Sequence, residues 1–374
     1  MKVLVESSLE READVVVIGG GLSGTSIAFH LARAGKKVVL VEKGALASGA
    51  SAASFGWISV HFASYMPEYP DYHMRLMRTA LDAYADLVRE LGEAIEYDAT
   101  GGLSLLYSEE ARRQKAELAR RLTAAGIEAD VISRAEVLRR EPALAGPFVG
   151  ALVSPREGLV NPFLLVRAFA RGAQARGAGI VTQTPVTGIE IRHGAVVAVV
   201  TPAGRIRTPV VVNACGVDAP AVGRMVGVEL PVQPNRGQQL VVEGRPGLIR
   251  GTLYGHVPIR HTRAGNYIVG GVREQAGYSN VVTPSGVGFV AKEVAEMIPG
   301  LGPLGVTRAF SGLRPVPADG KPIYGPVPGL RGYFVAALHF GLTLAPLTGR
   351  LLTSCVLGQE PEVDLRPYAP ERFL

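Results

Sequence analysis

The stretch from Asp14 to Glu42, DVVVIGGGLSGTSIAFHLARAGKKVVLVE, predicts a strand, a glycine turn, a helix and a second strand. Its first strand, Val15 to Ile18, is an apolar β-branched run typical of a fully buried parallel strand. Gly19, Gly21 and Gly24 follow in the G-x-G-x-x-G spacing. The first glycine allows a tight turn, the second lets backbone approach a pyrophosphate, and the third lets the helix lie close to the strand. The stretch therefore predicts a dinucleotide-binding unit.

Two further features of this unit favour a nucleotide. Glu42 closes the second strand about twenty residues past the last glycine, where a carboxylate can accept hydrogen bonds from both ribose hydroxyls. The helix beginning near Ser23 directs unpaired N–H groups at the turn, and these favour the negative charge of a pyrophosphate. The alternative is a glycine-rich turn that binds no ligand.

Composition narrows the class of protein. Of 374 residues, 47% are hydrophobic and 19% charged, so we expect a globular protein of two intertwined domains. The formal net charge is +6, but the basic residues are dispersed among acidic ones. This charge balance argues weakly for acidic small molecules as ligands and gives no case for nucleic acid as a binding partner. Cys215 and Cys355 form no CxxC motif, so we expect no metal and a reducing compartment. Since the N-terminus lacks a secretory pattern, the expected location is the cytoplasm.

The middle of the chain is rich in strand patterns. Residues 97–107 look like a strand pair, and residues 186–212 alternate as a small antiparallel ribbon. Residues 231–273 predict a second sheet. The stretch from Tyr333 to Gly349 is the most membrane-like, but it is short for a span and is interrupted by glycine and proline. We therefore expect it to form a buried strand running into a helix, with no membrane span.

A set of motifs in order along the chain identifies a family. The opening unit is followed by GASAASFGWIS, NACG, PNRGQQL, GLRPVPADGKPIYGP and HFGLTLAPLTGRLL. Together they resemble the FAD-dependent amine and amino-acid oxidoreductases of the D-amino-acid oxidase, glycine oxidase and sarcosine oxidase type. The resemblance covers nearly the whole chain.

The resemblance implies an α/β fold in which two domains alternate along the sequence. A Rossmann-like FAD-binding domain of the glutathione-reductase type would comprise residues 1–80, 152–228 and 308–374. An α+β substrate domain built on an antiparallel sheet would comprise residues 81–151 and 229–307.

The family pattern also implies which residues contact the cofactor. Leu22 and Ser23 would meet the pyrophosphate, Glu42 and Lys43 the ribose, and Val186 would lie near the adenine. The full implied set is Gly19, Gly21, Leu22, Ser23, Gly24, Glu42, Lys43, Ala50, Ser51, Gly56, Trp57, Val186, Gly341, Leu342, Thr343 and Leu344. Sarcosine oxidases attach flavin to a cysteine near the GLRP position, where this chain has Gly312. We therefore expect non-covalent FAD.

Three residues are candidates for the chemistry on the substrate. Arg314 in GLRP matches the family's carboxylate-binding arginine, and a guanidinium suits a carboxylate; the alternative is a structural ion pair with an acid such as Asp319. Tyr254 and His256 fall on a strand that usually faces the flavin, where they could contact carboxylate and amine, or simply pack. For His61 and His339 we expect structural roles.

The expected function is oxidation of the C–N bond of a small amino acid or N-substituted glycine to an imine, by hydride transfer to flavin N5. D-amino acids, glycine, sarcosine and proline-like compounds are the substrates that the resemblance implies. Ile268 stands where sarcosine oxidases carry an oxygen-activating lysine, which leans weakly toward a dehydrogenase. Open alternatives are the flavin subunit of a multi-subunit amino-acid or opine dehydrogenase, a non-catalytic flavoprotein subunit, and an NAD-dependent dehydrogenase. A homo-oligomer or an electron-accepting partner subunit is also open.

Overall fold

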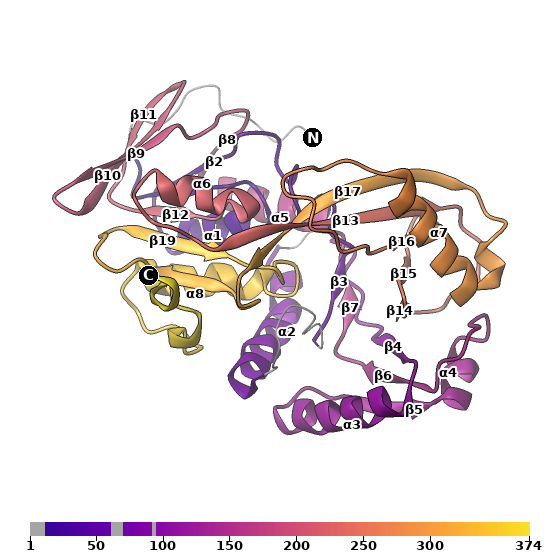
Figure 1. The fold of residues 1–374 in the computed structure, drawn as a ribbon. Helices are drawn as coiled ribbons and strands as arrows, with labels where there is room; N and C mark the ends of the chain where they lie inside the picture. Colours follow the sequence, from indigo (N-terminus) through magenta and orange to yellow (C-terminus); the bar gives the residue numbers. More distant parts are fainter. Residues whose placement is uncertain (1–11, 61–69, 92–94) are drawn as a thin grey trace.

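A six-stranded sheet forms the first half of the fold (Figure 1). The computed structural model describes residues 12–60, 70–91 and 95–374. In spatial order the strands are β18 (Ile323–Pro326), β19 (Tyr333–Ala337), β12 (Val211–Asn213), β1 (Val15–Ile18), β2 (Val38–Val41) and β8 (Gly179–Val181). All neighbours pair in parallel except β18 and β19. The predicted βαβ unit therefore lies at the centre of this sheet.

Apolar layers cover both faces of the central strand β1. Val15 and Val17 lie in the core beneath the helices, whereas Val16 and Ile18 lie in a second core on the other face. The helices over the first face are α1 (Leu22–Arg33), α5 (Pro162–Gln174), α8 (Ala345–Val356) and α2 (Asp71–Leu91). The second face carries α6 (Ala219–Arg224) and the antiparallel ribbon of β9 (Gly188–Arg192), β10 (Ala195–Thr201) and β11 (Gly204–Arg207). Burial on both faces explains why β1 has no polar residue.

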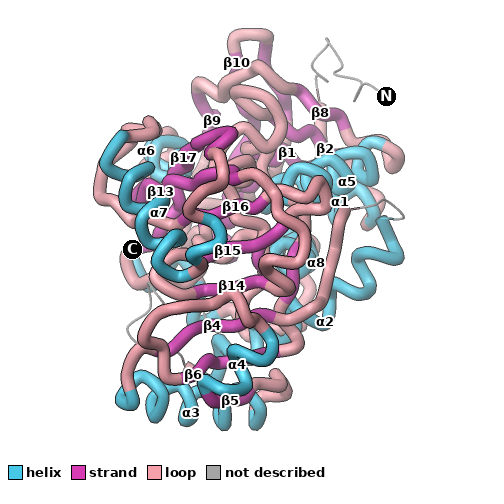
Figure 2. Tube along the Cα trace, turned by 90° about the vertical axis from the view of Figure 1, so that its right-hand side faces the viewer, coloured by secondary structure: helices cyan, strands magenta, loops and turns pink. Residues whose placement is uncertain are grey.

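An eight-stranded, mostly antiparallel sheet forms the second half of the fold, and its strands lie one below another in Figure 2. Its order is β17 (Val306–Pro317), β13 (Val232–Val242), β16 (Tyr267–Gly270), β15 (Pro258–His261), β14 (Thr252–Tyr254), β4 (Gly102–Leu106), β6 (Gly150–Ser154) and β5 (Asp130–Ser133). Helices α7 (Pro284–Met297), α3 (Glu109–Ala124) and α4 (Arg134–Arg140) pack along it. The short pair β3 (Trp57–Ile58) and β7 (Gly158–Leu159) lies between the two halves (Figure 1).

Several sequence expectations can be compared with these elements. The α/β class and the strand-to-helix form of 333–349 are confirmed. The antiparallel ribbon predicted over 186–212 forms over residues 188–207, whereas β12 at the end of that range joins the parallel sheet. The strand pair over 97–107 is wrong: only β4 forms there, because β6 and β14 occupy both its edges. Asp98 instead pairs with Leu159. The domain boundaries stay a prediction, and β17 crosses the one placed at residue 308. Within the described residues, no helix has the length and apolar character needed to cross a membrane.

His30 is the clearest titratable group inside the helical layer. It lies on α1 with 4% of its surface exposed, and its Nδ1 is 2.9 Å from the carbonyl oxygen of Ser26. Burial, the largest cause, lowers the pKa of His30 from 6.5 to about 4. In the unfolded chain the same imidazole takes up a proton near pH 6.5.

We predict that His30 makes the fold acid-sensitive between about pH 6.5 and pH 4. The pKa of His30 is lower in the folded protein than in the unfolded chain. Its contribution to the free energy of unfolding is therefore fully present above pH 6.5 and is lost as the pH falls, by up to about 3 kcal/mol. His30→Gln should lower the midpoint of thermal unfolding at pH 7.5 but flatten its decline toward pH 4.5. An equal slope in the variant would contradict the prediction. His193→Asn, at an exposed turn, is the control and should keep the native slope.

Candidate active site

A cavity of about 630 Å³ lies between the two halves of the fold. The six-stranded half contributes the β1–α1 turn, the end of β2, the segment 48–59 and the turn before α8. The eight-stranded half contributes β13, β14, β17 and the loop after β16. The volume falls within the range of about 300–1,000 Å³ typical of ligand sites.

At one end of the cavity, the glycine turn presents backbone without side chains. Gly19 has a φ of +114°, and a Cβ there would lie 2.5 Å from the carbonyl oxygen of Ala214. A Cβ on Gly24 would lie 1.8 Å from the carbonyl oxygen of Gly19, so Gly24 holds α1 against β1 from behind the cavity. The amide of Leu22 donates to the Ser51 hydroxyl at 3.0 Å, which brings the 48–59 segment to the helix N-terminus.

The charged side chains at this end of the cavity have defined hydrogen-bond partners. Glu42 accepts hydrogen bonds from the amides of Gly20 at 2.6 Å and Gly44 at 2.7 Å. Lys43 donates to Asp218 at 2.6 Å, and this hydrogen bond raises the pKa of Lys43. Cys215 also lines the cavity, and burial raises the pKa of its thiol. Glu42 and Lys43 both line the cavity, and these contacts define their orientations.

The segment that was predicted to line the flavin is held by both halves of the fold. Gln239 on β13 donates from Nε2 to the carbonyl oxygen of Ala53 at 2.6 Å, and Arg260 on β15 donates to the carbonyl oxygen of Phe55. A Cβ on Gly312 of β17 would lie 2.2 Å from the Ala53 Cβ, so this glycine admits the segment. Gly56, at a φ of +84°, makes the bend that follows.

Gln239 is a residue that sequence reasoning missed. Its side chain is 5% exposed, yet its Oε1 has no hydrogen-bond partner among the described residues. Gln239 lines the cavity, and its contact with Ala53 holds the 48–59 segment in the cavity wall. PNRGQQL was a recognised motif, but the glutamine that reaches the cavity is decided by strand register, which one sequence does not reveal.

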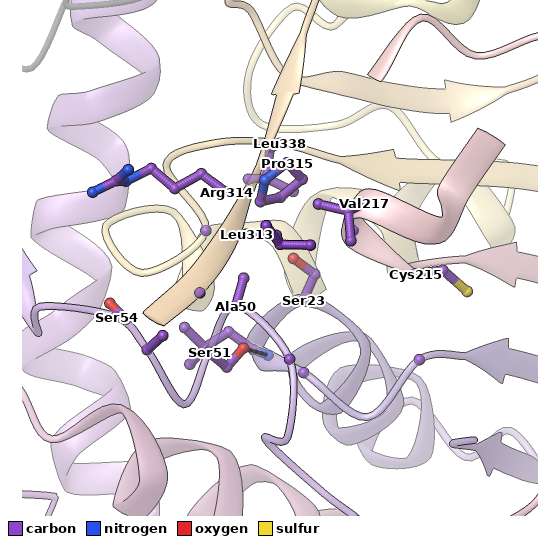
Figure 3. Close-up of a pocket in the computed structure, with 18 of the residues that line it drawn as sticks. Ser23, Ala50, Ser51, Ser54, Cys215, Val217, Leu313, Arg314, Pro315 and Leu338 are labelled. Atoms are coloured by element: carbon purple, nitrogen blue, oxygen red, sulfur yellow. Dashed lines mark hydrogen bonds between the residues drawn. The ribbon is translucent and has the colours of Figure 1, made fainter. Parts of the chain in front are cut away.

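Arg314 lies at the other end of the cavity from Cys215 (Figure 3). Its Nη1 donates to Asn235 Oδ1 at 3.3 Å and to the carbonyl oxygen of Val272 at 3.1 Å. The guanidinium lies over Gly237, where a Cβ would approach it to 2.4 Å. Asp319, the acid suggested as a structural partner, instead pairs with Arg372 at 2.9 Å. Arg314 is therefore oriented within the cavity by neutral oxygens.

Tyr254 reaches the cavity, whereas His256 does not appear in its described lining. The Tyr254 ring lies 5.9 Å from the Trp57 ring, and its hydroxyl accepts a hydrogen bond from Arg273 at 3.2 Å. His256 is exposed, stacks on Tyr107 at 4.1 Å and lies 3.8 Å from Glu293. β14 ends at Tyr254, and the bend over residues 255–257 directs His256 away from the cavity.

The turn before α8 also lines the cavity. Gly341, Leu342 and Thr343 face it, whereas Leu344 is fully buried beneath. His339 in the same wall was expected to be structural; desolvation, followed by the charges of Arg314 and Arg273, lowers its pKa to about 3. His61 lies outside the described residues.

The placements of the predicted cofactor residues can now be summarised. Those that line the cavity are Gly19, Gly21, Leu22, Ser23, Glu42, Lys43, Ala50, Ser51, Trp57, Val186, Gly341, Leu342 and Thr343. Gly24, Gly56 and Leu344 shape the surrounding backbone instead. In the described part of the chain, no three His, Cys, Asp or Glu side chains are grouped to hold a metal ion.

The fold and the cavity define a two-part dinucleotide-binding protein. The model of the DAO family, described as FAD dependent oxidoreductase, matches residues 14–355, and the chain belongs to this family. The chain is 31% identical to the glycine oxidase of Bacillus licheniformis, with 97% of this chain and 98% of the relative aligned. It is 32% identical to the glycine oxidase of Geobacillus kaustophilus, with 96% and 97% aligned. The crystal structure of L-proline dehydrogenase from P. horikoshii superposes with a TM-score of 0.91 at 26% identity, covering 98% of both chains.

The residues of this cavity fit FAD. The glycine turn leaves at one end the backbone space that a pyrophosphate needs, and the amide of Gly20 and the carboxylate of Glu42 lie beside it. The protein is therefore an FAD-dependent oxidoreductase, and the NAD-dependent alternative is set aside. The turn at Gly19 to Ser23 with Glu42 would hold the nucleotide, and the 50–57 segment with Gly341 to Thr343 would hold the flavin ring.

We predict that the flavin is not covalently attached. Burial raises the pKa of Cys215, its Sγ donates to the carbonyl oxygen of Ile18 at 3.3 Å, and it lies at the opposite end of the cavity from Arg314. Burial also raises the pKa of Cys355 to about 11, so neither thiol is a ready nucleophile. Acid precipitation should leave all yellow colour in the supernatant. Flavin fluorescence in the washed pellet would contradict this.

Gln239→Leu should weaken FAD binding. The substitution removes the donor to Ala53 and the buried acceptor, and one buried hydrogen bond is worth about 1–3 kcal/mol, so the dissociation constant should rise roughly tenfold or more. The measurement is fluorescence titration of FAD into flavin-free protein. Gln359→Leu, at an exposed position, should bind FAD like the native chain. Equal affinity in both variants would remove Gln239 from the cofactor site.

Proposed function

We propose that the protein oxidises the C–N bond of a small amino acid or N-substituted glycine to an imine, which water hydrolyses. The observation that carries this proposal is an oriented guanidinium, Arg314, in the same cavity as the predicted flavin segment. A planar guanidinium recognises a carboxylate with two parallel hydrogen bonds. Relatives named as glycine oxidases and a neighbour named as proline dehydrogenase support the same class of substrate.

The side chains at this end would position the substrate. Arg314 would bind the carboxylate, and the Trp57 and Tyr254 rings would form a wall beside it. When bound, FAD accepts a hydride from the substrate carbon. The lone pair of the neutral substrate nitrogen forms the double bond as the hydride leaves, and the resulting iminium afterwards loses a proton to water. The protein's contribution is therefore orientation and exclusion of water.

We propose that no side chain acts as an essential base. The pKa of His339, the imidazole in the cavity wall, is lowered to about 3, so it is neutral and a very weak base at ordinary pH. The substrate must then arrive as, or become, the neutral amine. The rate should accordingly rise with pH as the substrate ammonium loses its proton.

The partners and location are also proposals. The absence of a disulfide between Cys215 and Cys355 is consistent with action in the reducing cytoplasm. The electron acceptor is either oxygen or a partner subunit, and a homo-oligomer is a further option. Copurifying subunits together with activity on dyes but not in air would favour the flavin subunit of a multi-subunit dehydrogenase. A correctly loaded protein whose flavin no amino acid reduces would favour a non-catalytic subunit.

Arg314→Lys should raise KM about 10- to 100-fold, because lysine loses the bidentate fork and a charge-assisted hydrogen bond is worth about 1.5–3 kcal/mol. The flavin content per protein should stay unchanged. The assay is anaerobic loss of flavin absorbance at about 450 nm with glycine, sarcosine, proline and D-amino acids. Arg308→Lys, exposed on the same strand, is the matched control and should leave KM unchanged. An unaltered KM in Arg314→Lys would reject this carboxylate site.

A further inference from the structure

A buried tyrosine contacts the turn before α8 from behind the cavity wall. Tyr84 lies on α2, which packs against α8, and its side chain is fully buried. Its hydroxyl donates to the carbonyl oxygen of Leu342 at 2.5 Å. Leu342 lines the cavity, whereas Tyr84 is outside the described lining. Tyr84 therefore touches the backbone of a cavity wall without touching the cavity itself.

This hydrogen bond fixes the orientation of one peptide group in the turn. The Leu342 carbonyl also accepts from the amide of Ala345 at 3.1 Å, and Ala345 is buried outside the described cavity lining. Two donors therefore hold this carbonyl on the side away from the cavity. In a planar trans peptide the C=O and the N–H point in opposite directions. The N–H of Thr343, which belongs to the same peptide group, is consequently directed toward the cavity.

The Thr343 amide is a donor that the protein leaves open. No described residue accepts a hydrogen bond from this N–H. The Thr343 side chain is fixed separately, because its hydroxyl accepts from the amide of Ser59 at 3.2 Å. Helix α8 begins two residues later, and an oriented amide beside a helix N-terminus favours negative charge. The turn thus presents a fixed positive dipole to the part of the cavity that would hold the flavin ring.

We propose that Tyr84 is a positioning residue for the flavin, which holds the Thr343 amide where it stabilises the reduced cofactor. A hydride carries two electrons and one proton, so the flavin gains one negative charge when it accepts a hydride. Without the Tyr84 hydroxyl, the Leu342 carbonyl loses one of its two donors and the peptide group can turn away. This inference goes beyond the proposed function, because it concerns the cofactor and holds for any substrate.

A second buried tyrosine beside α8 provides a matched control. Tyr324 on β18 is 1% exposed, and its hydroxyl shares a hydrogen bond of 2.7 Å with the Thr348 hydroxyl. Burial raises the pKa of both Tyr84 and Tyr324, so each hydroxyl stays protonated at ordinary pH. Tyr324→Phe therefore removes a buried hydrogen bond next to the same helix but leaves the turn intact.

The reduction potential of the bound flavin tests the proposal without any amino acid. It is measured anaerobically by chemical reduction against a reference dye, with FAD present at saturation. Tyr84→Phe should shift the reduction equilibrium at least about tenfold toward oxidised flavin, which lowers the two-electron potential by about 30 mV. Tyr324→Phe should keep the native potential. Equal potentials in the native protein and Tyr84→Phe, or equal shifts in the two variants, would overturn the proposal.

Two further measurements separate the hydroxyl from simple packing. Thermal unfolding should show similar losses of stability in Tyr84→Phe and Tyr324→Phe, so stability alone cannot explain a difference in potential. The Tyr84 ring stacks on Tyr97 at 5.5 Å, and Tyr84→Leu removes this ring together with the hydroxyl. The leucine variant should show the same shift in potential as the phenylalanine variant. A shift confined to Tyr84→Leu would assign the effect to the ring and overturn the proposal.

The proposed function and this inference can fail separately. The potential requires bound FAD but no substrate, so a protein whose flavin no amino acid reduces can still show the shift in Tyr84→Phe. Conversely, efficient oxidation of an amino acid together with an unchanged potential in Tyr84→Phe would leave the proposed function standing and remove Tyr84 from the cofactor site.

Discussion

The close approach of α1 to β1 is the constraint on which the rest of the structure depends. A Cβ on Gly24 would lie 1.8 Å from the carbonyl oxygen of Gly19, and a Cβ on Gly19 would meet Ala214. Only glycine at both positions lets the helix begin directly over the end of the central strand. The carbonyl end of the sheet is thereby left as bare backbone, so a dinucleotide can approach a helix N-terminus there.

Distant parts of the chain meet around that helix through specific polar contacts. Ser26 on α1 donates to the carbonyl oxygen of Ala345 at 2.6 Å, which fixes the start of α8. The Thr343 hydroxyl accepts a hydrogen bond from the amide of Ser59 at 3.2 Å, so the turn before α8 and the 48–59 segment form one wall of the cavity. Gln239 joins that wall to the second sheet through Ala53. The cavity is therefore assembled by tertiary contacts between segments 284 and 319 residues apart.

Charge is distributed unequally along the cavity. At the nucleotide end, Lys43 pairs with Asp218, and Glu42 is held by backbone amides. At the other end, Arg314 donates to oxygens of Asn235 and Val272, and Arg273 donates to the Tyr254 hydroxyl. Burial, followed by the charges of Arg314 and Arg273, lowers the pKa of His339 and keeps it neutral. The oriented guanidinium of Arg314, more than any acid or base, accounts for the proposed recognition of a carboxylate.

The amino-acid sequence by itself determined the βαβ unit, the family, FAD dependence and Arg314 as the candidate carboxylate site. The βαβ unit follows from local spacing, because turn geometry and buried strands depend on residues adjacent in sequence. The family, FAD dependence and Arg314 follow from the resemblance of the ordered motifs to a known family. The tertiary structure alone decided that Gln239 and Arg273 reach the cavity, that His256 packs on Tyr107, and that β17 belongs to the larger sheet. Each depends on strand register or on a loop path, and a shift of one residue reverses the face on which a side chain lies.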